Sequence, residues 1–237
     1  MQSIIVASND KGCLIMRDNK SAYNANKYDE NIVSTLPYYR EYHNQIIDLV
    51  KAMGIKDIEW LDTGCGTGTL AGRVSECRDD VRFTLCDPSE QMLEIAKSKL
   101  EGRDIRTFNI PSQQMTFNSE FDVVTAVQSH HYLQPDERKT AVGNCYRALK
   151  DNGVFIAFEN IRMTTESSDK IALKRWENFL SDHLKDPAVV KMHMDRRGVE
   201  VFPITIEEHI KVLHEAGFKS VDVLWTSYLQ AGFWAVK

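Results

Sequence analysis

The apolar positions of this chain show two patterns: a spacing of three and four residues, and short continuous runs. Between residues 37 and 53 they recur three and four positions apart, which predicts an amphipathic helix that ends at Gly54. From residue 58 onward, short apolar runs typical of buried strands alternate with helical segments. This alternation predicts an α/β fold in which helices cover both faces of a parallel sheet. The predicted strands cover residues 58–62, 81–86, 105–110, 121–127 and 153–158, and the predicted helices 69–77, 89–100 and 136–149.

Two stretches break this alternation. Residues 1–27 are polar and weakly periodic, which predicts an arm or loop. Residues 160–203 are charged and helical in part, with an apolar stripe that includes Trp176 and Phe179, which predicts an inserted helical lid. Thr205 and Glu208 have the spacing of a capping box, so we expect a helix from there to Gly217. Two further strands, 221–225 and 228–236, then close the chain.

A glycine-rich turn follows the first predicted strand and opens the first helix of the alternating region. Its sequence is Asp62-Thr63-Gly64-Cys65-Gly66-Thr67-Gly68. Glycines let the backbone turn sharply and approach a ligand, and the free N–H groups of the helix start lie beside such a ligand. Asp87 ends the next strand, where a carboxylate can accept both hydroxyls of a ribose. The two features together predict a nucleoside-containing ligand.

Two kinds of ligand compete for this turn. Dinucleotide dehydrogenases carry the pattern GxGxxG, whereas this chain has GxGxG from Gly64 to Gly68. Asp62 lies two residues before the first glycine, where it would repel a pyrophosphate but would fit a cationic amino group. The pattern therefore favours a ligand with an amino-acid end and a ribose, as in S-adenosylmethionine.

These motifs resemble those of the class I S-adenosylmethionine-dependent methyltransferases. Residues 61–68 are similar to the first motif of that family, 87–93 to the segment that holds the ribose, 121–124 to the fourth strand, and 149–153 to the turn before the fifth strand. The resemblance covers about residues 28–237. It implies a doubly wound, seven-stranded, mostly parallel Rossmann-like sheet with one antiparallel strand near its end. It also implies S-adenosylmethionine as cofactor and S-adenosylhomocysteine as product.

The resemblance also implies a division of the chain and a set of binding residues. Residues 1–54 would form an arm and helix that cover the cofactor, and residues 55–237 the methyltransferase domain, with the lid at about 160–203. Many relatives carry an acid after the third strand, near adenine; here Ser112 or Gln113 would take that role by hydroxyl or amide. The expected cofactor-binding residues are Asp62, Gly64, Cys65, Gly66, Gly68, Asp87, Pro88, Met92, Ser112, Gln113 and Gln128.

Candidates for catalysis and acceptor binding follow the strand ends. One of His130 and His131 could be a general base, or one could pack beneath the cofactor and the other cap a turn. Tyr28 lies in the segment expected to fold over the cofactor, where an aromatic face would attract the sulfonium. Arg196, beside Arg197, is either solvated or turned inward to recognise an anion. The expected acceptor-binding residues are Tyr23, Tyr132, Glu159 and Arg196.

A narrower resemblance leaves an alternative open. Residues 28–30 and 36–39 are similar to the N-terminal helix of carboxy-S-adenosylmethionine synthases, and Arg196 falls where those enzymes bind the extra carboxylate. The expected function is methyl transfer to a small molecule. Carboxy-S-adenosylmethionine synthesis, or a non-catalytic protein that binds S-adenosylmethionine, is the alternative.

Composition narrows the expected partners. The 237 residues carry a net charge of −5, with 43% hydrophobic and 27% charged residues, values of an ordinary globular protein. Nucleic-acid binders usually carry a basic surface, and no apolar run approaches the length of a membrane span. The five cysteines form no CxxC pair and the seven histidines no HExxH, so we expect no metal. We expect a cytoplasmic monomer or homodimer that acts on a small acceptor, with no nucleic acid and no membrane as partner.

Overall fold

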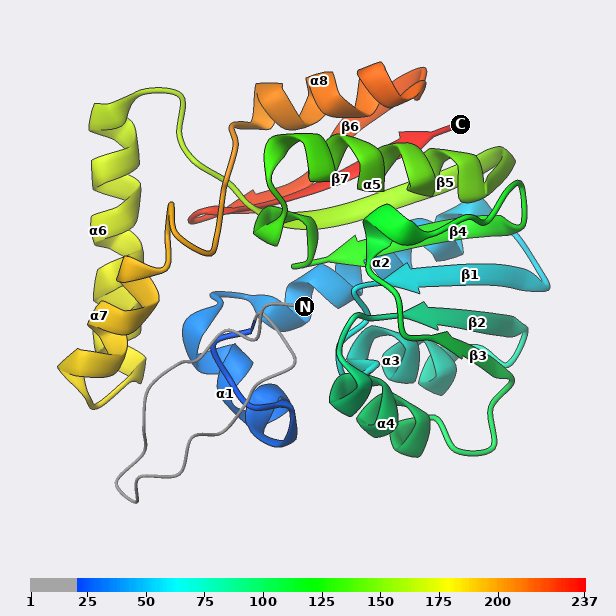
Figure 1. Ribbon diagram of the computed structural model, residues 1–237, viewed down its shortest axis with the longest axis horizontal. Coiled ribbons are helices and arrows are strands. Elements are labelled where there is room, and N and C mark those ends of the chain that lie inside the picture. The colour runs from blue at the N-terminus through cyan, green and yellow to red at the C-terminus, as the bar shows by residue number, and fades with distance from the viewer. Residues whose placement is uncertain (1–20) are drawn as a thin grey trace.

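The computed structural model describes residues 21–237, and their backbone is built around one sheet (Figure 1). The sheet has seven strands in the order β3-β2-β1-β4-β5-β7-β6. Strands β3, β2, β1, β4 and β5 are parallel, and β7 lies antiparallel between β5 and β6. This confirms the predicted fold class. The strands are β1 Ile58–Thr63, β2 Val81–Cys86, β3 Ile105–Phe108, β4 Phe121–Val127, β5 Leu149–Asn160, β6 Ser220–Ser227 and β7 Gln230–Val236.

Helices cover both faces because neighbouring strand residues point to opposite sides. Trp60 and Leu61 are adjacent in β1 and fully buried, yet they belong to separate apolar clusters. Trp60 faces the cluster built with α2 (Tyr39–Met53), α3 (Thr69–Cys77) and α4 (Glu90–Lys99). Leu61 faces the cluster built with α5 (Pro135–Ala148) and α8 (Ile206–Ala216). Among residues 21–237, no helix combines the length and apolar character needed to cross a membrane.

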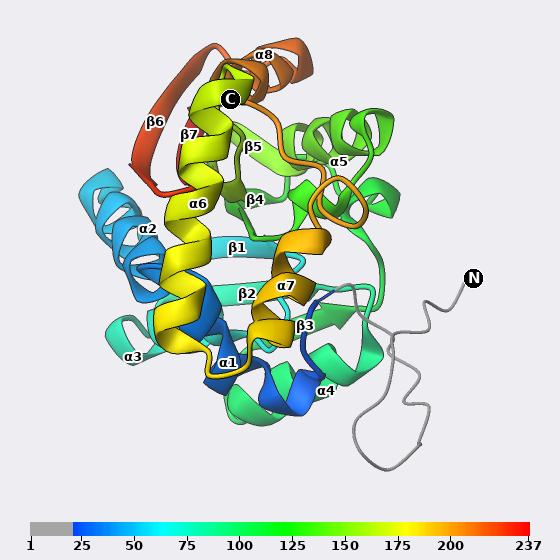
Figure 2. The same ribbon diagram turned by 90° about the vertical axis from the view of Figure 1, so that its left-hand side faces the viewer.

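The remaining helices lie across the carboxyl ends of the parallel strands (Figure 2). They are α1 (Tyr28–Thr35), α6 (Glu166–His183) and α7 (Pro187–Asp195). The Thr165 hydroxyl caps α6 by accepting from Ser168 N, and Asp186 caps α7 by accepting from Ala188 N. Trp176 Nε1 of α6 donates to the carbonyl of Thr35 at 2.9 Å, which joins α6 to the end of α1. The segment expected to form a lid is thus largely helical.

Some element boundaries differ from the predictions for local reasons. Strand β3 ends at Phe108 rather than 110, because the Ile110 amide turns back to donate to the Phe108 carbonyl. Strand β5 begins at Leu149 rather than 153. Helix α1 is not predicted by periodicity, which indicates a helix only over residues 37–53. It ends before Pro37, since proline disfavours helical backbone at the preceding residue, and α2 begins after Tyr38.

Candidate functional site

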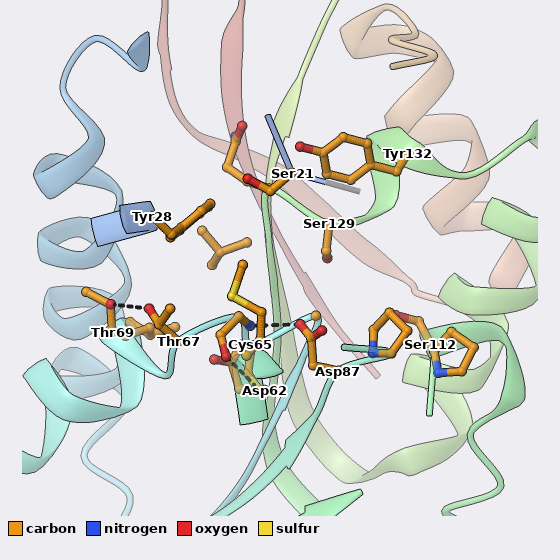
Figure 3. Close-up of a pocket in the computed structure, with 18 of the residues that line it drawn as sticks. Ser21, Tyr28, Asp62, Cys65, Thr67, Thr69, Asp87, Ser112, Ser129 and Tyr132 are labelled. Carbon is orange, nitrogen blue, oxygen red and sulfur yellow. Dashed lines mark hydrogen bonds between the residues drawn. The ribbon is translucent and has the colours of Figure 1, made fainter. Parts of the chain in front are cut away.

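A cavity of about 320 Å³ lies at the carboxyl ends of β1, β2 and β4 (Figure 3). Asp62, Cys65 and Asp87 lie on one side of it, and Tyr28 and Tyr132 lie on the other. The wall combines the glycine turn, the ends of three strands and α1. Of the residues expected to bind the cofactor, those lining the cavity are Asp62, Gly64, Cys65, Gly66, Asp87, Pro88, Met92, Ser112, Gln113 and Gln128.

The glycines of the turn have different surroundings, although all three have positive φ angles between 54° and 70°. A Cβ on Gly64 would lie 2.4 Å from the Cβ of Ser129, and a Cβ on Gly68 would lie 2.9 Å from that of Ala96. A Cβ on Gly66 would meet no atom within 4 Å. Gly64 and Gly68 therefore permit close packing of the chain, whereas Gly66 leaves open space beside the cavity. Gly68, expected to bind the cofactor, instead packs against α4.

Asp87 is oriented by the backbone around it. One carboxylate oxygen accepts from the Gly66 amide at 2.9 Å and the other from the Ser89 amide at 2.9 Å. The Ser89 hydroxyl in turn caps α4 by accepting from Met92 N at 3.1 Å, as its sequence position predicts. This chain of contacts fixes the carboxylate at the cavity wall.

Asp62 is a buried carboxyl group with few donors around it. Asp62 is only 2% exposed, and its Oδ1 accepts a hydrogen bond from the Thr125 hydroxyl at 2.7 Å. Burial raises the pKa of Asp62 to about 7, against the hydrogen bond from Thr125, which lowers it. A carboxyl group in this state gains strongly from a cation placed beside it. The arrangement suits the ammonium group of an amino acid.

The cavity wall near the end of β3 contains a hydrogen-bond acceptor that has no donor. Gln113 Oε1 is buried and has no hydrogen-bond partner among the described residues. The neighbouring Ser112 is held in place, since its hydroxyl lies 2.8 Å from Thr63 Oγ1 and its carbonyl accepts from Asn144 Nδ2 at 2.9 Å. An amide oxygen left without a donor in a buried wall suits an amino group such as that of adenine. Gln113 is better placed for this contact than Ser112.

A second cavity of about 60 Å³ adjoins the first. Ser21, Tyr28, Gln128 and Tyr132 line both cavities. The Gln128 side chain is held by a 2.7 Å hydrogen bond from its Nε2 to Gln230 Oε1, and its φ of 53° lies in the strained left-handed region. The smaller cavity also contains Tyr23, His131, Asn160, His193, Arg196 and Arg197.

Both arginines of this cavity are largely buried, so neither is a solvated surface residue. Their side chains are each 13% exposed. Arg196 Nε donates to Glu200 Oε2 at 2.6 Å, and its guanidinium lies 5.8 Å from the centre of the Tyr132 ring. Arg197 pairs with Asp169 at 3.0 Å and donates to Asn160 Oδ1 at 3.0 Å. Each guanidinium of this cavity is therefore paired with a carboxylate of the chain.

The two adjacent histidines have different positions. Glu159 accepts from the amides of His130 and His131 at 3.1 and 2.8 Å, and its Oε2 lies 3.0 Å from His131 Nδ1. Burial opposes ionisation of Glu159, but the hydrogen bond from His131 lowers its pKa to about 2. His131 lines the smaller cavity, whereas His130 and Glu159 lie behind the walls of both cavities. His130, a candidate general base, and Glu159, a candidate for acceptor binding, are thus buried residues that line neither cavity.

Other residues at the site were not expected from the sequence. Asp29 of α1 accepts from Thr67 and Thr69 of the glycine turn at 2.6 and 3.0 Å, and from Lys99 of α4 at 2.7 Å. Thr67 could have been suspected from its place within the turn. His193 could not, because nothing in its helical spacing separates a cavity-lining histidine from an exposed one. Residues 1–20 of the predicted arm lie outside the described residues.

Comparison with known proteins gives one matching family model and several relatives. A family model described as a methyltransferase domain matches residues 61–155. Curated relatives include the carboxy-S-adenosyl-L-methionine synthase of Staphylococcus epidermidis, 25% identical over 223 residues that cover 92% of this chain and 96% of the relative. The enzyme of the same name from Campylobacter lari is 25% identical over 210 residues, covering 86% and 88%.

Solved structures with similar folds are more distant in sequence. A SAM-dependent methyltransferase from Thermotoga maritima has a TM-score of 0.57 at 17% identity and covers 90% of this chain and 95% of its own. The SAM-dependent methyltransferase SibL has a TM-score of 0.62 at 14% identity, covering 84% and 55%. At these identities the likeness establishes the fold alone. Residues 61–155, which carry the glycine turn and Asp87, thus match a methyltransferase domain of the class I S-adenosylmethionine-dependent superfamily, and nearly the whole chain is similar to the curated relatives.

Proposed function

We propose that the protein binds S-adenosylmethionine in the larger cavity and transfers its methyl group to a small anionic acceptor in the smaller one. The observation that carries this proposal is the shared wall of the two cavities. Asp62 and Asp87 lie in the larger cavity, and Tyr28 and Tyr132 form the junction. A ligand held by both carboxylates would have its reactive end close to that junction.

Each end of the ligand has a matching group. Asp62 would pair with the ammonium group, Asp87 would accept from the ribose hydroxyls, and the free Gln113 oxygen would accept from the adenine amino group. The aromatic rings of Tyr28 and Tyr132 would attract the positive sulfur at the junction. When bound, S-adenosylmethionine supplies a methyl group on a sulfonium that leaves as a neutral thioether.

The smaller cavity indicates the charge of the acceptor. Arg196 and Arg197 both line it, and each would have to exchange or share its carboxylate partner, Glu200 or Asp169, with a bound anion. A buried guanidinium favours a carboxylate or phosphate, with which it forms charge-assisted hydrogen bonds. The chain's own residues would hold such an acceptor against the junction and exclude water, and correct positioning alone can supply roughly 7–11 kcal/mol of a transfer barrier.

A second candidate is favoured by the same arginine. The curated relatives are named carboxy-S-adenosyl-L-methionine synthases. In that case Arg196 would pair with a carboxylate carried by the nucleoside itself rather than by a separate acceptor. The two candidates therefore assign the same guanidinium to different molecules.

Mass spectrometry separates these candidates. Bound nucleosides are extracted from the purified protein and identified by mass. In parallel, the protein is incubated with methyl-labelled S-adenosylmethionine and a bacterial metabolite extract. We expect S-adenosylmethionine or S-adenosylhomocysteine to be bound, and a labelled methyl group on an anionic metabolite. Recovery of a carboxylated sulfonium that is lost in Arg196→Ala would favour the second candidate. A protein that binds the nucleoside but never consumes it would be a binding protein without this activity.

A further inference from the structure

Tyr23 and His193 form a hydrogen-bonded pair in the smaller cavity. Tyr23 Oη lies 3.1 Å from His193 Nε2, and the two ring centroids are 5.5 Å apart. The residues are 170 positions apart, with Tyr23 just before α1 and His193 near the end of α7. The pair therefore exists only because these two segments meet over the ends of the strands.

We propose that Tyr23 and His193 together remove the proton from a hydroxyl group of the acceptor as it takes up the methyl group. This inference rests on the proposed methyl transfer and deepens it, since it assigns oxygen as the attacking atom. Both residues line the cavity that also contains Arg196, so one small space offers a site for a negative charge and a proton acceptor. A small acid with a phenolic hydroxyl group fits that combination, since tyrosine and tryptophan side chains also line the cavity.

The step balances as a proton relay. The acceptor oxygen forms a bond to the methyl carbon while the carbon–sulfur bond breaks and its electron pair stays on sulfur. The acceptor's O–H proton passes to Tyr23 Oη, and the proton of Tyr23 passes to His193 Nε2. The products are a methyl ether, S-adenosylhomocysteine and an imidazolium ion, which returns its proton to water.

The surroundings of His193 suit an oxygen acceptor. Burial, together with the positive charge of Arg196, lowers the pKa of His193 to about 4. An oxygen that gains a methyl group before losing its proton is far more acidic than any imidazolium ion, so even this weak base accepts the proton. A methylated amine would be less acidic than His193 and would keep its proton. The other titratable or charged residues that line this cavity are Tyr28, His131, Tyr132, Arg196 and Arg197.

His131 is less suited to this role. Its Nδ1 lies 3.0 Å from the buried carboxylate of Glu159, which also holds its amide. Its ring orientation is thus tied to the loop after β4, whereas His193 is linked to a tyrosine hydroxyl at the cavity wall. The relay requires one tautomer of His193, in which Nδ1 carries the proton and Nε2 accepts from Tyr23.

Nitrogen-15 NMR of the imidazole groups tests this tautomer without any turnover. The protein is saturated with S-adenosylhomocysteine, and His193 is assigned by comparison with His193→Gln. We expect an unprotonated, hydrogen-bonded Nε2 at pH 7, and a change in its chemical shift in Tyr23→Phe. A protonated Nε2 that donates to Tyr23 would overturn the proposal.

A kinetic experiment then separates proton transfer from positioning. Single-turnover methyl transfer is measured with labelled S-adenosylmethionine and the same metabolite extract, for wild type, Tyr23→Phe and His193→Gln. We expect rates about 10²-fold lower in both variants at pH 7, with the loss shrinking toward pH 9.5, where the acceptor ionises unaided. Their dissociation constants for S-adenosylhomocysteine should stay within about twofold of wild type.

Tyr38→Phe is the matched control, because Tyr38 is 61% exposed and lies outside both cavities. Its rate should equal that of wild type. Wild-type rates in Tyr23→Phe, or a loss that is equal at every pH, would refute the relay. If wild-type protein labels no metabolite in the extract, the proposed function fails instead, and the NMR result alone decides whether His193 can accept a proton.

Discussion

Asp29 of α1 and Lys99 of α4 form an ion pair that crosses the outside of the glycine turn, with Lys99 Nζ 2.7 Å from Asp29 Oδ2. The other oxygen of Asp29 accepts from Thr67 and Thr69. Three elements that are distant in the sequence thus meet at one carboxylate. Tyr28 precedes Asp29 and lines both cavities. This contact therefore holds the start of α1 in place over the larger cavity.

Asp29→Ala should loosen that cover. The ion pair is partly exposed, so it contributes roughly 0–1 kcal/mol, but the loss of the hydroxyl donors adds about 1 kcal/mol more. We expect weaker binding of S-adenosylhomocysteine by about 5- to 30-fold and faster hydrogen exchange in residues 28–35. Lys97→Met is the control, since Lys97 pairs with Glu94 on the exposed part of the same helix. Unchanged exchange in α1 would contradict the assignment.

Cofactor binding should release protons near neutral pH. The pKa of Asp62 is about 7, raised by burial from an ordinary 3.8, so the carboxyl is about half protonated at pH 7. An ammonium group beside it lowers that pKa and drives the proton off. Calorimetry of S-adenosylhomocysteine binding in phosphate and in Tris should therefore give different heats, corresponding to about 0.5 proton released. Equal heats in the two buffers, or the same difference in Asp62→Asn, would rule this out.

The same group should make stability depend on pH. A carboxyl whose pKa is raised in the folded state destabilises the fold as pH rises from about 4 to 7, because ionisation then costs more in the folded chain. Asp62→Asn removes that cost and keeps an acceptor for Thr125. We expect the variant without ligand to be more stable than wild type by about 1–3 kcal/mol at pH 8 and nearly equal at pH 4. Denaturant unfolding at the two pH values measures the difference, and a gain that is equal at both would contradict it.

Asp87→Ala should weaken nucleoside binding strongly. If two ribose hydroxyls donate to this carboxylate, their loss costs roughly 1.5–3 kcal/mol, or about 10- to 150-fold in affinity. The melting temperature should also fall, because Asp87 accepts from the Gly66 and Ser89 amides. Asp79→Ala provides the comparison, since that side chain is 93% exposed. An unchanged dissociation constant for S-adenosylhomocysteine would mean that the ribose is held elsewhere.

The glycine turn offers a test that separates binding from packing. Gly66→Ala and Gly68→Ala both force alanine into a left-handed backbone, which costs roughly 1–2 kcal/mol each. Gly68→Ala also places its Cβ 2.9 Å from the Cβ of Ala96, which is too close for normal packing. This variant should therefore have the lower melting temperature. Gly66→Ala should cause the larger loss of S-adenosylhomocysteine affinity, since its Cβ enters open space at the cavity. Thermal unfolding and calorimetry on both variants give the two rankings, and a reversed order in either would show that the roles are exchanged.

The fold and the cofactor cavity could be predicted because their signals are local. A buried strand, a glycine turn and the next helix follow one another in the chain, so Asp62 and Gly66 are placed by their own neighbours. Asp87 is placed by the end of the next strand. Parallel pairing then brings the ends of β1 and β2 together whatever the rest of the chain does.

Tyr23, Tyr132 and Arg196 were expected to bind an acceptor, but the full lining of the smaller cavity could not be predicted, because segments far apart in the chain meet there. Tyr23, His131 and Arg196 are brought together by α1, the loop after β4 and the end of α7. His130 and His131 are adjacent in a three-residue 3₁₀ turn, too short for any period to show which ring faces the cavity. Glu159 ends a strand at the ligand-binding edge, but its side chain serves the two histidine amides instead.

The hydrogen bond from Trp176 to the Thr35 carbonyl also affects the order of binding. This bond joins α6 to α1, and α6 packs against α7 through Trp176, Leu180 and Val190. The three helices that line or cover the two cavities are therefore linked to one another. We expect a nucleoside to reach the larger cavity, which Tyr28 of α1 lines, only while α1, α6 and α7 are displaced together. Such a protein would follow a compulsory order, with the nucleoside first to arrive and last to depart, and release of S-adenosylhomocysteine would then set the pace of each cycle.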